Sequence, residues 1–188
     1  MPRKLKDTKQ EAFERGQRVE EAAQNLAQRL HNKKCGRATR WQDKYEHWDF
    51  GMRPAKGGPR EYVEVKGAKS VFRHPWVRQD EWTWLEYRGV SSSESFVNGG
   101  WLYGGKADYV AFERRYDFLI ARRTDLITLL ERMVPRTGSP YIKHEKEPAF
   151  YKLKSRPDRH DIVSLVETRL IEQIACDVWP KQKPGYIN

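Results

Sequence analysis

Residues 60–67 constrain the fold more than any other stretch, because apolar and polar side chains alternate along them. Val63 and Val65 fall on one face of the predicted strand, whereas Glu64 and Lys66 fall on the other. A glycine follows where the strand should end. Two opposite charges of this strand therefore point the same way.

An acidic residue precedes this strand across a loop. Asp49 stands just before residues 51–59, whose prolines and glycines predict a turn or a flexible loop. An ordinary cross-strand ion pair on an exposed sheet face would also explain Glu64 and Lys66. However, an Asp, a loop and then Glu-x-Lys at the end of an apolar strand form a pattern typical of metal-dependent phosphodiesterases.

Phosphodiester hydrolysis needs these residue types at this spacing. A divalent cation binds the phosphate and lowers the pKa of the attacking water, and Mg²⁺ takes carboxylate oxygens and waters as ligands. Asp49 and Glu64 are therefore the candidate metal ligands, and Mn²⁺ is expected to substitute for Mg²⁺. Lys66 lies on the same side of the strand as Glu64. There its ammonium can orient the water, hold the phosphate, or act as the base if its pKa is lowered.

This segment resembles the PD-(D/E)XK nuclease superfamily, whose signature is an acidic residue on one strand and Glu-x-Lys on the next. Trp48 stands where the nominal motif has Pro before Asp49. The resemblance covers about residues 8–134, and it includes a Gly-Trp segment at residues 100–112 that leads into a strand with Asp108. It implies an α/β fold with a restriction-endonuclease-like core, in which helices flank a mixed central sheet. It also implies Mg²⁺-dependent cleavage of DNA.

The first predicted helix carries one more candidate catalytic residue. Residues 8–33 show the period of an amphipathic helix. Within it Gly16 is followed four residues later by Glu20, as in many nucleases of this superfamily, where that Glu faces the active site. The alternative is that Glu20, like Glu21, is an ordinary solvated acid. The apolar stripe consists of Phe13, Val19, Ala23, Leu26 and Leu30.

The charge of the chain favours a polyanionic partner. The net charge is +10 and the sequence pI is about 9.6, which favours nucleic acid, here DNA. Basic residues beside aromatic ones suit phosphate contact combined with base stacking. Solvated loops whose aromatic side chains pack on the core are the alternative. The candidate nucleic-acid-binding residues are Arg40, Trp41, Lys69, Arg73, His74 and Arg78.

The glycines of residues 100–106 satisfy the G-x-x-x-x-G-K pattern of a phosphate-binding P-loop. Ala107 follows where a P-loop has Ser or Thr, and the next segment has the pattern of a strand rather than a helix. A Gly-rich hairpin is therefore the expected structure. Beyond it, the sequence predicts strands at 108–112, 118–121 and 162–166, a helix at 125–133 capped by Thr124, and a closing helix at 167–178. Upstream, residues 82–87 are expected to complete a three-stranded meander that carries the site.

The length of 188 residues fits one nuclease-like domain. Its core is expected at about residues 8–134, with accessory elements at 138–180 and a tail at 181–188. No apolar run approaches the roughly 18 residues that a membrane span needs, so a cytoplasmic location and no membrane partner are expected. Cys35 and Cys176 show no metal-ligand spacing, which fits a reducing compartment.

Other functions and assemblies stay open at this stage. The same fold without turnover would be a nucleic-acid-binding module. A basic structural or interaction protein that binds an acidic partner is a third class. A homodimer is left open as the assembly state.

Overall fold

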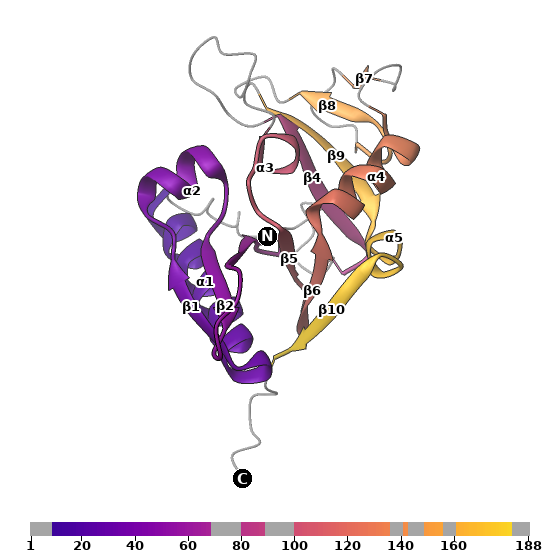
Figure 1. Cartoon of the computed structure of the whole chain (residues 1–188). Coiled ribbons are helices and arrows are strands. Elements are labelled where there is room, and N and C mark those ends of the chain that lie inside the picture. Colours follow the sequence, from indigo (N-terminus) through magenta and orange to yellow (C-terminus); the bar gives the residue numbers. More distant parts are fainter. Residues whose placement is uncertain are drawn as a thin grey trace, which may run out of the picture.

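The computed structural model describes a mixed α/β protein with two β-sheets and five helices among its described residues (Figure 1). The described residues are 9–68, 80–88, 100–135, 141–142, 149–155 and 161–181. The helices are α1 (Lys9–His31), α2 (Arg40–Glu46), α3 (Gly100–Tyr103), α4 (Arg123–Met133) and α5 (Thr168–Glu172). The strands are β1 (Lys33–Arg37), β2 (Phe50–Pro54), β3 (Glu61–Lys66), β4 (Trp82–Arg88), β5 (Tyr109–Glu113), β6 (Asp117–Arg122), β7 (Tyr141–Ile142), β8 (Leu153–Ser155), β9 (Ile162–Glu167) and β10 (Ala175–Pro180).

The larger sheet has six strands in the order β1-β2-β3-β5-β6-β10. The first three form an antiparallel meander, in which Phe50 of β2 pairs with Val63 of β3. Next, β3 and β5 pair in parallel, with Val63 opposite Tyr109, and β5, β6 and β10 continue antiparallel. The chain between β3 and β5 leaves this sheet to form β4 and α3, because two parallel strands cannot be joined by a tight turn.

The smaller sheet has the order β4-β9-β8-β7. The strand at Trp82–Arg88 forms as predicted, but it pairs with β9 and not with β3. The prediction that it completes a meander around the site is therefore wrong. The meander instead begins at β1, where no strand was predicted.

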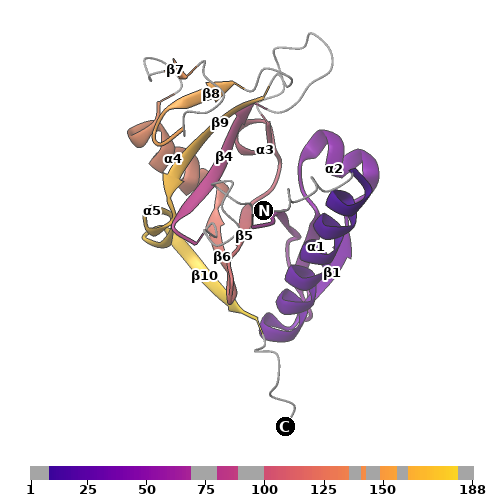
Figure 2. The same cartoon turned by 180° about the vertical axis from the view of Figure 1, so that it is seen from behind.

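The helix α1 covers one face of the larger sheet (Figure 2). Ala23, Leu26 and Ala27 of α1 pack with Val63 and Val65 of β3 in one buried cluster. Two members of the expected stripe, Phe13 and Leu30, are exposed. A 23-residue helix is about 35 Å long whereas a six-residue strand spans about 20 Å, so the helix extends beyond the sheet.

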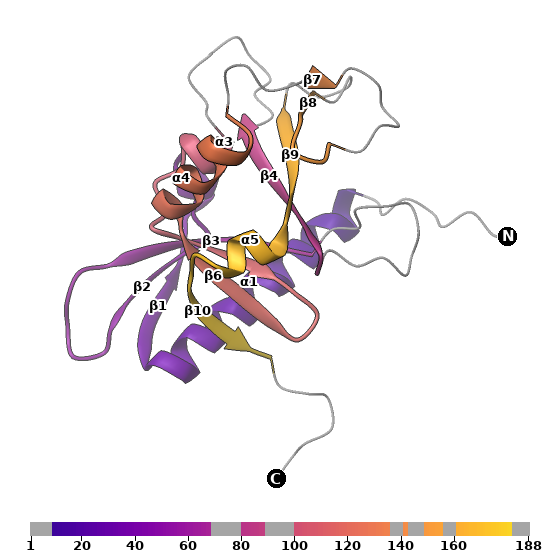
Figure 3. The same ribbon diagram turned by 90° about the vertical axis from the view of Figure 1, so that its right-hand side faces the viewer.

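The other face of the larger sheet packs against α3, α4, α5 and the smaller sheet (Figure 3). Leu102, Leu126, Leu130 and Ile171 are fully buried there. The centre of the larger sheet, at β5 and β6, is thus buried on both faces, which explains the nearly continuous apolar sequence of these two strands. No helix in the described part of the chain is long and apolar enough to cross a bilayer.

Several local predictions are corrected by pairing between distant segments. Residues 50–54 form β2 in spite of Gly51 and Pro54, because strands pair with β2 on both sides. The predicted closing helix at 167–178 is wrong, since α5 ends at Glu172 and β10 pairs with β6. Val178, the last residue of that predicted helix, is exposed.

Two predicted details around the helices are also wrong. Thr124 does not cap α4. This helix begins at Arg123, and Arg122 is at its N-cap position without a side-chain hydrogen bond. The expected Gly-rich hairpin is the single helical turn of α3, and Gly105 follows in close contact with it. The strand pattern after residue 107 is confirmed, because β5 follows.

We predict that Gly105→Ala lowers the free energy of unfolding by about 1–3 kcal/mol, the usual range for an overpacked interior. A Cβ at Gly105 would lie 2.3 Å from the backbone oxygen of Trp101, so the chain would have to shift. Gly36→Ala is the matched control, because a Cβ there meets no described atom within 4 Å. Chemical denaturation of both variants tests this, and equal stabilities would contradict it.

Candidate active site

The strand β3 places Glu64 and Lys66 on the face that lies opposite Val63 and Val65. Glu64 is only 5% exposed. Its Oε1 accepts a hydrogen bond from Nζ of Lys66. Its other oxygen, Oε2, is buried and has no hydrogen-bond partner among the described residues. Such an unsatisfied buried group costs about 1–3 kcal/mol, and more if it is charged.

Asp49 is held against β3 by backbone hydrogen bonds. The N–H of Val65 donates to Oδ2 of Asp49 at 2.5 Å, and the N–H of Asp49 donates to the carbonyl of Val63 at 2.8 Å. Asp49 lies immediately before β2, which pairs with β3. One hairpin therefore delivers Asp49, Glu64 and Lys66 together, as the sequence pattern predicts.

Two further carboxylates approach from the helices. Burial raises the pKa of Glu20 on α1, and the charges of Asp43 and Glu64 add to this rise. Desolvation raises the pKa of Asp43 on α2, and the charge of Glu64 again adds to it. Glu20, Asp43, Asp49 and Glu64 therefore share one electrostatic environment, which we call the acidic cluster.

Asp43 is not among the predicted site residues, and no helix was predicted around it. A local signal was present in the capping box of α2. The N–H of Gln42 donates to Oγ1 of Thr39 at 3.3 Å, and the N–H of Thr39 donates to Oε1 of Gln42 at 2.9 Å. The Thr-x-x-Gln spacing marks a helix start, and that helix carries Asp43 toward Glu64.

The surroundings raise the pKa of both Asp49 and Lys66, which favours the neutral form of Asp49 and the charged form of Lys66. Burial and the charge of Glu64 hold the pKa of Asp49 well above its usual value. Burial alone would lower the pKa of Lys66, but the charges of Glu64 and Asp49 outweigh it and the net shift is upward. Lys66 is therefore a charged ammonium at neutral pH.

The opposite side of the site is formed by α3 and β4. Nζ of Lys66 lies 5.0 Å from the ring centroid of Trp101, which is buried. Glu86 of β4 also contributes to the raised pKa of Lys66. Figure 1 shows α2 and α3 at the same end of the molecule. The Lys66 side chain thus lies between an aromatic ring and carboxylates.

The P-loop interpretation of residues 100–106 receives no support from the geometry. A P-loop needs a helix after its lysine, so that backbone N–H groups and the helix dipole bind phosphate. Here β5 follows, and Nζ of Lys106 pairs with Glu46 at 2.7 Å.

The predicted nucleic-acid-binding residues divide into two groups. Arg40 and Trp41 lie on the exposed surface of α2, in the helix that carries Asp43. The other four lie outside the described residues; they are Lys69, Arg73, His74 and Arg78.

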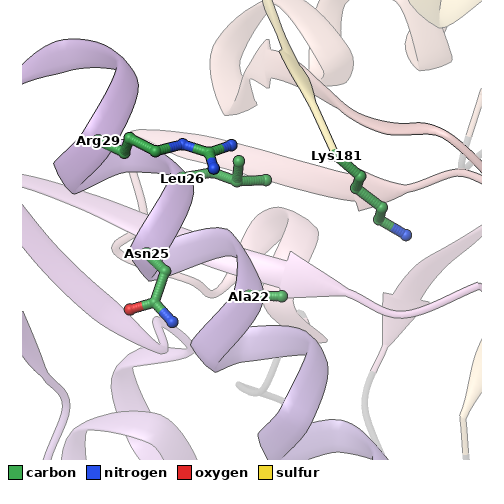
Figure 4. A pocket seen from close by; sticks show the side chains of 5 residues that line it. All are labelled: Ala22, Asn25, Leu26, Arg29 and Lys181. Carbon is green, nitrogen blue, oxygen red and sulfur yellow. The ribbon is translucent and has the colours of Figure 1, made fainter. Parts of the chain in front are cut away.

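Two cavities lie away from the acidic cluster. One, of about 330 Å³, lies beside α1 and is lined by Ala22, Asn25, Leu26, Arg29 and Lys181 (Figure 4). The other, of about 240 Å³, contains the Lys33 and Glu61 pair at 3.1 Å and the His31 and Asp177 pair at 3.0 Å. Neither is lined by Asp49, Glu64 or Lys66, so the candidate site stands apart from both.

Among the described residues, no group of three or more His, Cys, Asp and Glu side chains is arranged to hold a metal ion. The comparisons with known proteins found no matching family model, no matching curated protein and no matching solved structure. The interpretation of the site therefore depends on its own geometry and chemistry.

We predict that Asp49→Asn stabilises the metal-free protein at pH 8. Because the native pKa of Asp49 is raised, the stability that its protonation contributes is present below its unfolded pKa and is lost as the pH rises through its native pKa. The amide oxygen can still accept the Val65 hydrogen bond. Thermal unfolding in chelator should show a gain of at least about 2–4 °C, which corresponds to roughly 1 kcal/mol in a chain of this size.

The pH dependence provides the control for this prediction. The gain from Asp49→Asn should shrink as the pH falls toward 4, because the wild-type carboxyl becomes neutral. Glu21→Gln changes an exposed acid of α1 and should leave the melting temperature unchanged at both pH values. A destabilised Asp49→Asn protein at pH 8 would contradict the prediction.

Proposed function

We propose that this chain is a Mg²⁺-dependent deoxyribonuclease with a restriction-endonuclease-like core of the PD-(D/E)XK type. The observation that carries the proposal is the buried carboxylate of Glu64 beside Asp49. Lys66 donates a hydrogen bond to one of its oxygens, and the other has no hydrogen-bond partner in the part of the chain that the structure describes. The arrangement of an acid before one strand and Glu-x-Lys on the next strand supports the same conclusion.

The residues present fit a hard divalent cation. Mg²⁺ is commonly bound through one or two carboxylates, with waters and substrate phosphate completing its shell, so a larger protein ligand set is not required. Asp49 and Glu64 would hold it, and Oε2 of Glu64 is the oxygen that accepts no hydrogen bond from the described residues. When bound, Mg²⁺ would bind the scissile phosphate and lower the pKa of the attacking water.

Lys66 supplies positive charge at the reacting phosphate. Its raised pKa favours the two roles that need an ammonium, which are holding a phosphate oxygen and orienting the water, over the role of a free base. The ring of Trp101 limits where the ammonium can lie. The charges of Glu20 and Asp43 act on the carboxylates of this region, so we assign both as positioning residues.

A non-catalytic binding module is the second candidate, but the burial of Glu64 argues against it. A module that only binds DNA gains nothing from an unsatisfied buried carboxylate, whose cost would be avoided by an apolar residue. The positive net charge suits DNA binding in both cases.

We predict that Asp49→Asn, Glu64→Gln and Lys66→Ala each lower Mg²⁺-dependent cleavage of plasmid DNA by at least about a hundredfold. Each variant should remain folded by circular dichroism. Glu61→Gln is the matched control, because Glu61 is on the same strand but pairs with Lys33 on the opposite face. Cleavage at the wild-type rate by any two of the three variants would refute the site assignment. DNA binding without cleavage by the wild type would favour the binding module.

A second prediction separates the two acids of α1. Glu20→Gln should lower turnover at saturating DNA by about tenfold or more, as the loss of a group that orients metal ligands can. Glu21→Gln should be nearly neutral, since Glu21 lies about 100° further around the helix and is exposed. Both rates are measured over a range of Mg²⁺ concentrations. Equal and small effects of the two substitutions on turnover would indicate that α1 has a purely structural role.

A further inference from the structure

The helix α2 presents two large aromatic side chains to solvent. Trp41 is 59% exposed and Tyr45 is 54% exposed, and none of the residues of α2 is buried. Single exposed aromatics are common, but these two lie four residues apart and therefore share one face of the helix. Their ring centroids are 5.5 Å apart, with an interplanar angle of 41°. We call Trp41 and Tyr45 the aromatic pair.

Positive charge accompanies the aromatic pair. Nζ of Lys44 lies 4.8 Å from the ring centroid of Tyr45, and Arg40 is exposed beside Trp41 at the start of the helix. A cation beside aromatic rings matches a ligand that combines a flat π-system with negative charge. A nucleotide, with its base and phosphate, has this combination.

The helix fixes the aromatic pair in relation to the acidic cluster. Asp43 lies two residues from both Trp41 and Tyr45, so its side chain points about 200° around the helix from each. The charge of Glu64 helps to raise the pKa of Asp43, so the two carboxylates share one electrostatic environment. The capping box of Thr39 fixes the N-terminus of the helix, and His47 ends the helix in a left-handed conformation. The pair is thus attached to a defined helix that also contributes to the site.

The exposed faces of the aromatic pair suit an unpaired strand better than a duplex. In a duplex the faces of the bases are covered by their neighbours, and only the edges are accessible in the grooves. Unpaired bases expose their faces and can stack on aromatic side chains.

We propose that Trp41 and Tyr45 stack unpaired bases of a DNA strand that continues into the site formed by Asp49, Glu64 and Lys66. The preferred substrate is then single-stranded DNA or a duplex with a single-stranded arm. The stacking itself is independent of catalysis, whereas the link to cleavage rests on the proposed nuclease function.

Binding is tested in chelator, so that no cleavage is needed. Fluorescence anisotropy is measured with a labelled single strand, a blunt duplex and a duplex with an overhang. The double variant Trp41→Ala and Tyr45→Ala should bind the single strand and the overhang at least about tenfold more weakly, because stacking on aromatic side chains is strong for each base. Blunt duplex binding should change by less than about twofold, since phosphate contacts remain.

Tyr116→Ala is the matched control. Tyr116 is 61% exposed and has Arg115 at 4.9 Å from its ring, but it lies in the turn between β5 and β6. Its replacement should leave all three affinities unchanged. Trp41→Phe should retain most of the single-strand affinity. Because α2 has no buried residue, the double variant should also melt at the wild-type temperature.

The outcomes separate this inference from the proposed function. Loss of single-strand binding in the double variant supports stacking, even if the wild type cleaves no DNA when Mg²⁺ is added. Three results would overturn it, even if Mg²⁺-dependent cleavage is observed. The double variant could bind single strands as well as the wild type, or it could lose as much affinity for the blunt duplex as for the single strand. The third result is a wild type that does not bind single strands. A parallel series with an RNA strand tests whether the sugar matters. If the wild type binds the RNA and DNA strands with equal affinity, the aromatic pair binds unpaired nucleic acid of either kind, and the restriction to DNA is overturned.

Discussion

The buried carboxylate of Glu64 is the interaction on which the site depends. One of its oxygens accepts a hydrogen bond from Lys66, and the other has no hydrogen-bond partner among the residues that the structure describes. Removing a charge from water is costly unless it is paired and hydrogen-bonded. The surrounding fold must therefore compensate, and the two apolar clusters on either face of the larger sheet provide the burial that does so.

The parallel pairing of β3 with β5 shapes the site around this carboxylate. It sends the chain out of the larger sheet between the two strands, and this excursion forms β4 and α3. Trp101 of α3 then lies beside the Lys66 ammonium, and Glu86 of β4 adds negative charge nearby. The close approach of Gly105 to the backbone of Trp101 keeps this turn compact. The surroundings of the Lys66 ammonium are thus a consequence of the sheet topology.

The short helix α2 links the chemistry to the surface. One side carries Asp43, whose pKa is raised in part by the charge of Glu64, and the other side presents Trp41 and Tyr45 to solvent. A helix of seven residues is marginal by itself, so its capping box and its place between β1 and β2 must hold it. A function that needs both carboxylates and unpaired nucleotides would use both sides of this one element.

The sequence by itself determined the elements whose periodicity is local. The long helix at Lys9–His31, the strand with Glu64 and Lys66, and the strands β5, β6 and β9 were all predictable, because apolar spacing and turn residues are properties of neighbouring residues. The grouping of Asp49, Glu64 and Lys66 was predictable for the same reason, since one hairpin joins them. Only the tertiary structure decided that β4 joins the second sheet, that residues 175–180 form a strand, and that the charge of Glu64 acts on Asp43. These features depend on strand pairing and charge interactions between segments that are separated along the chain. Local propensity cannot specify which distant segment becomes the partner.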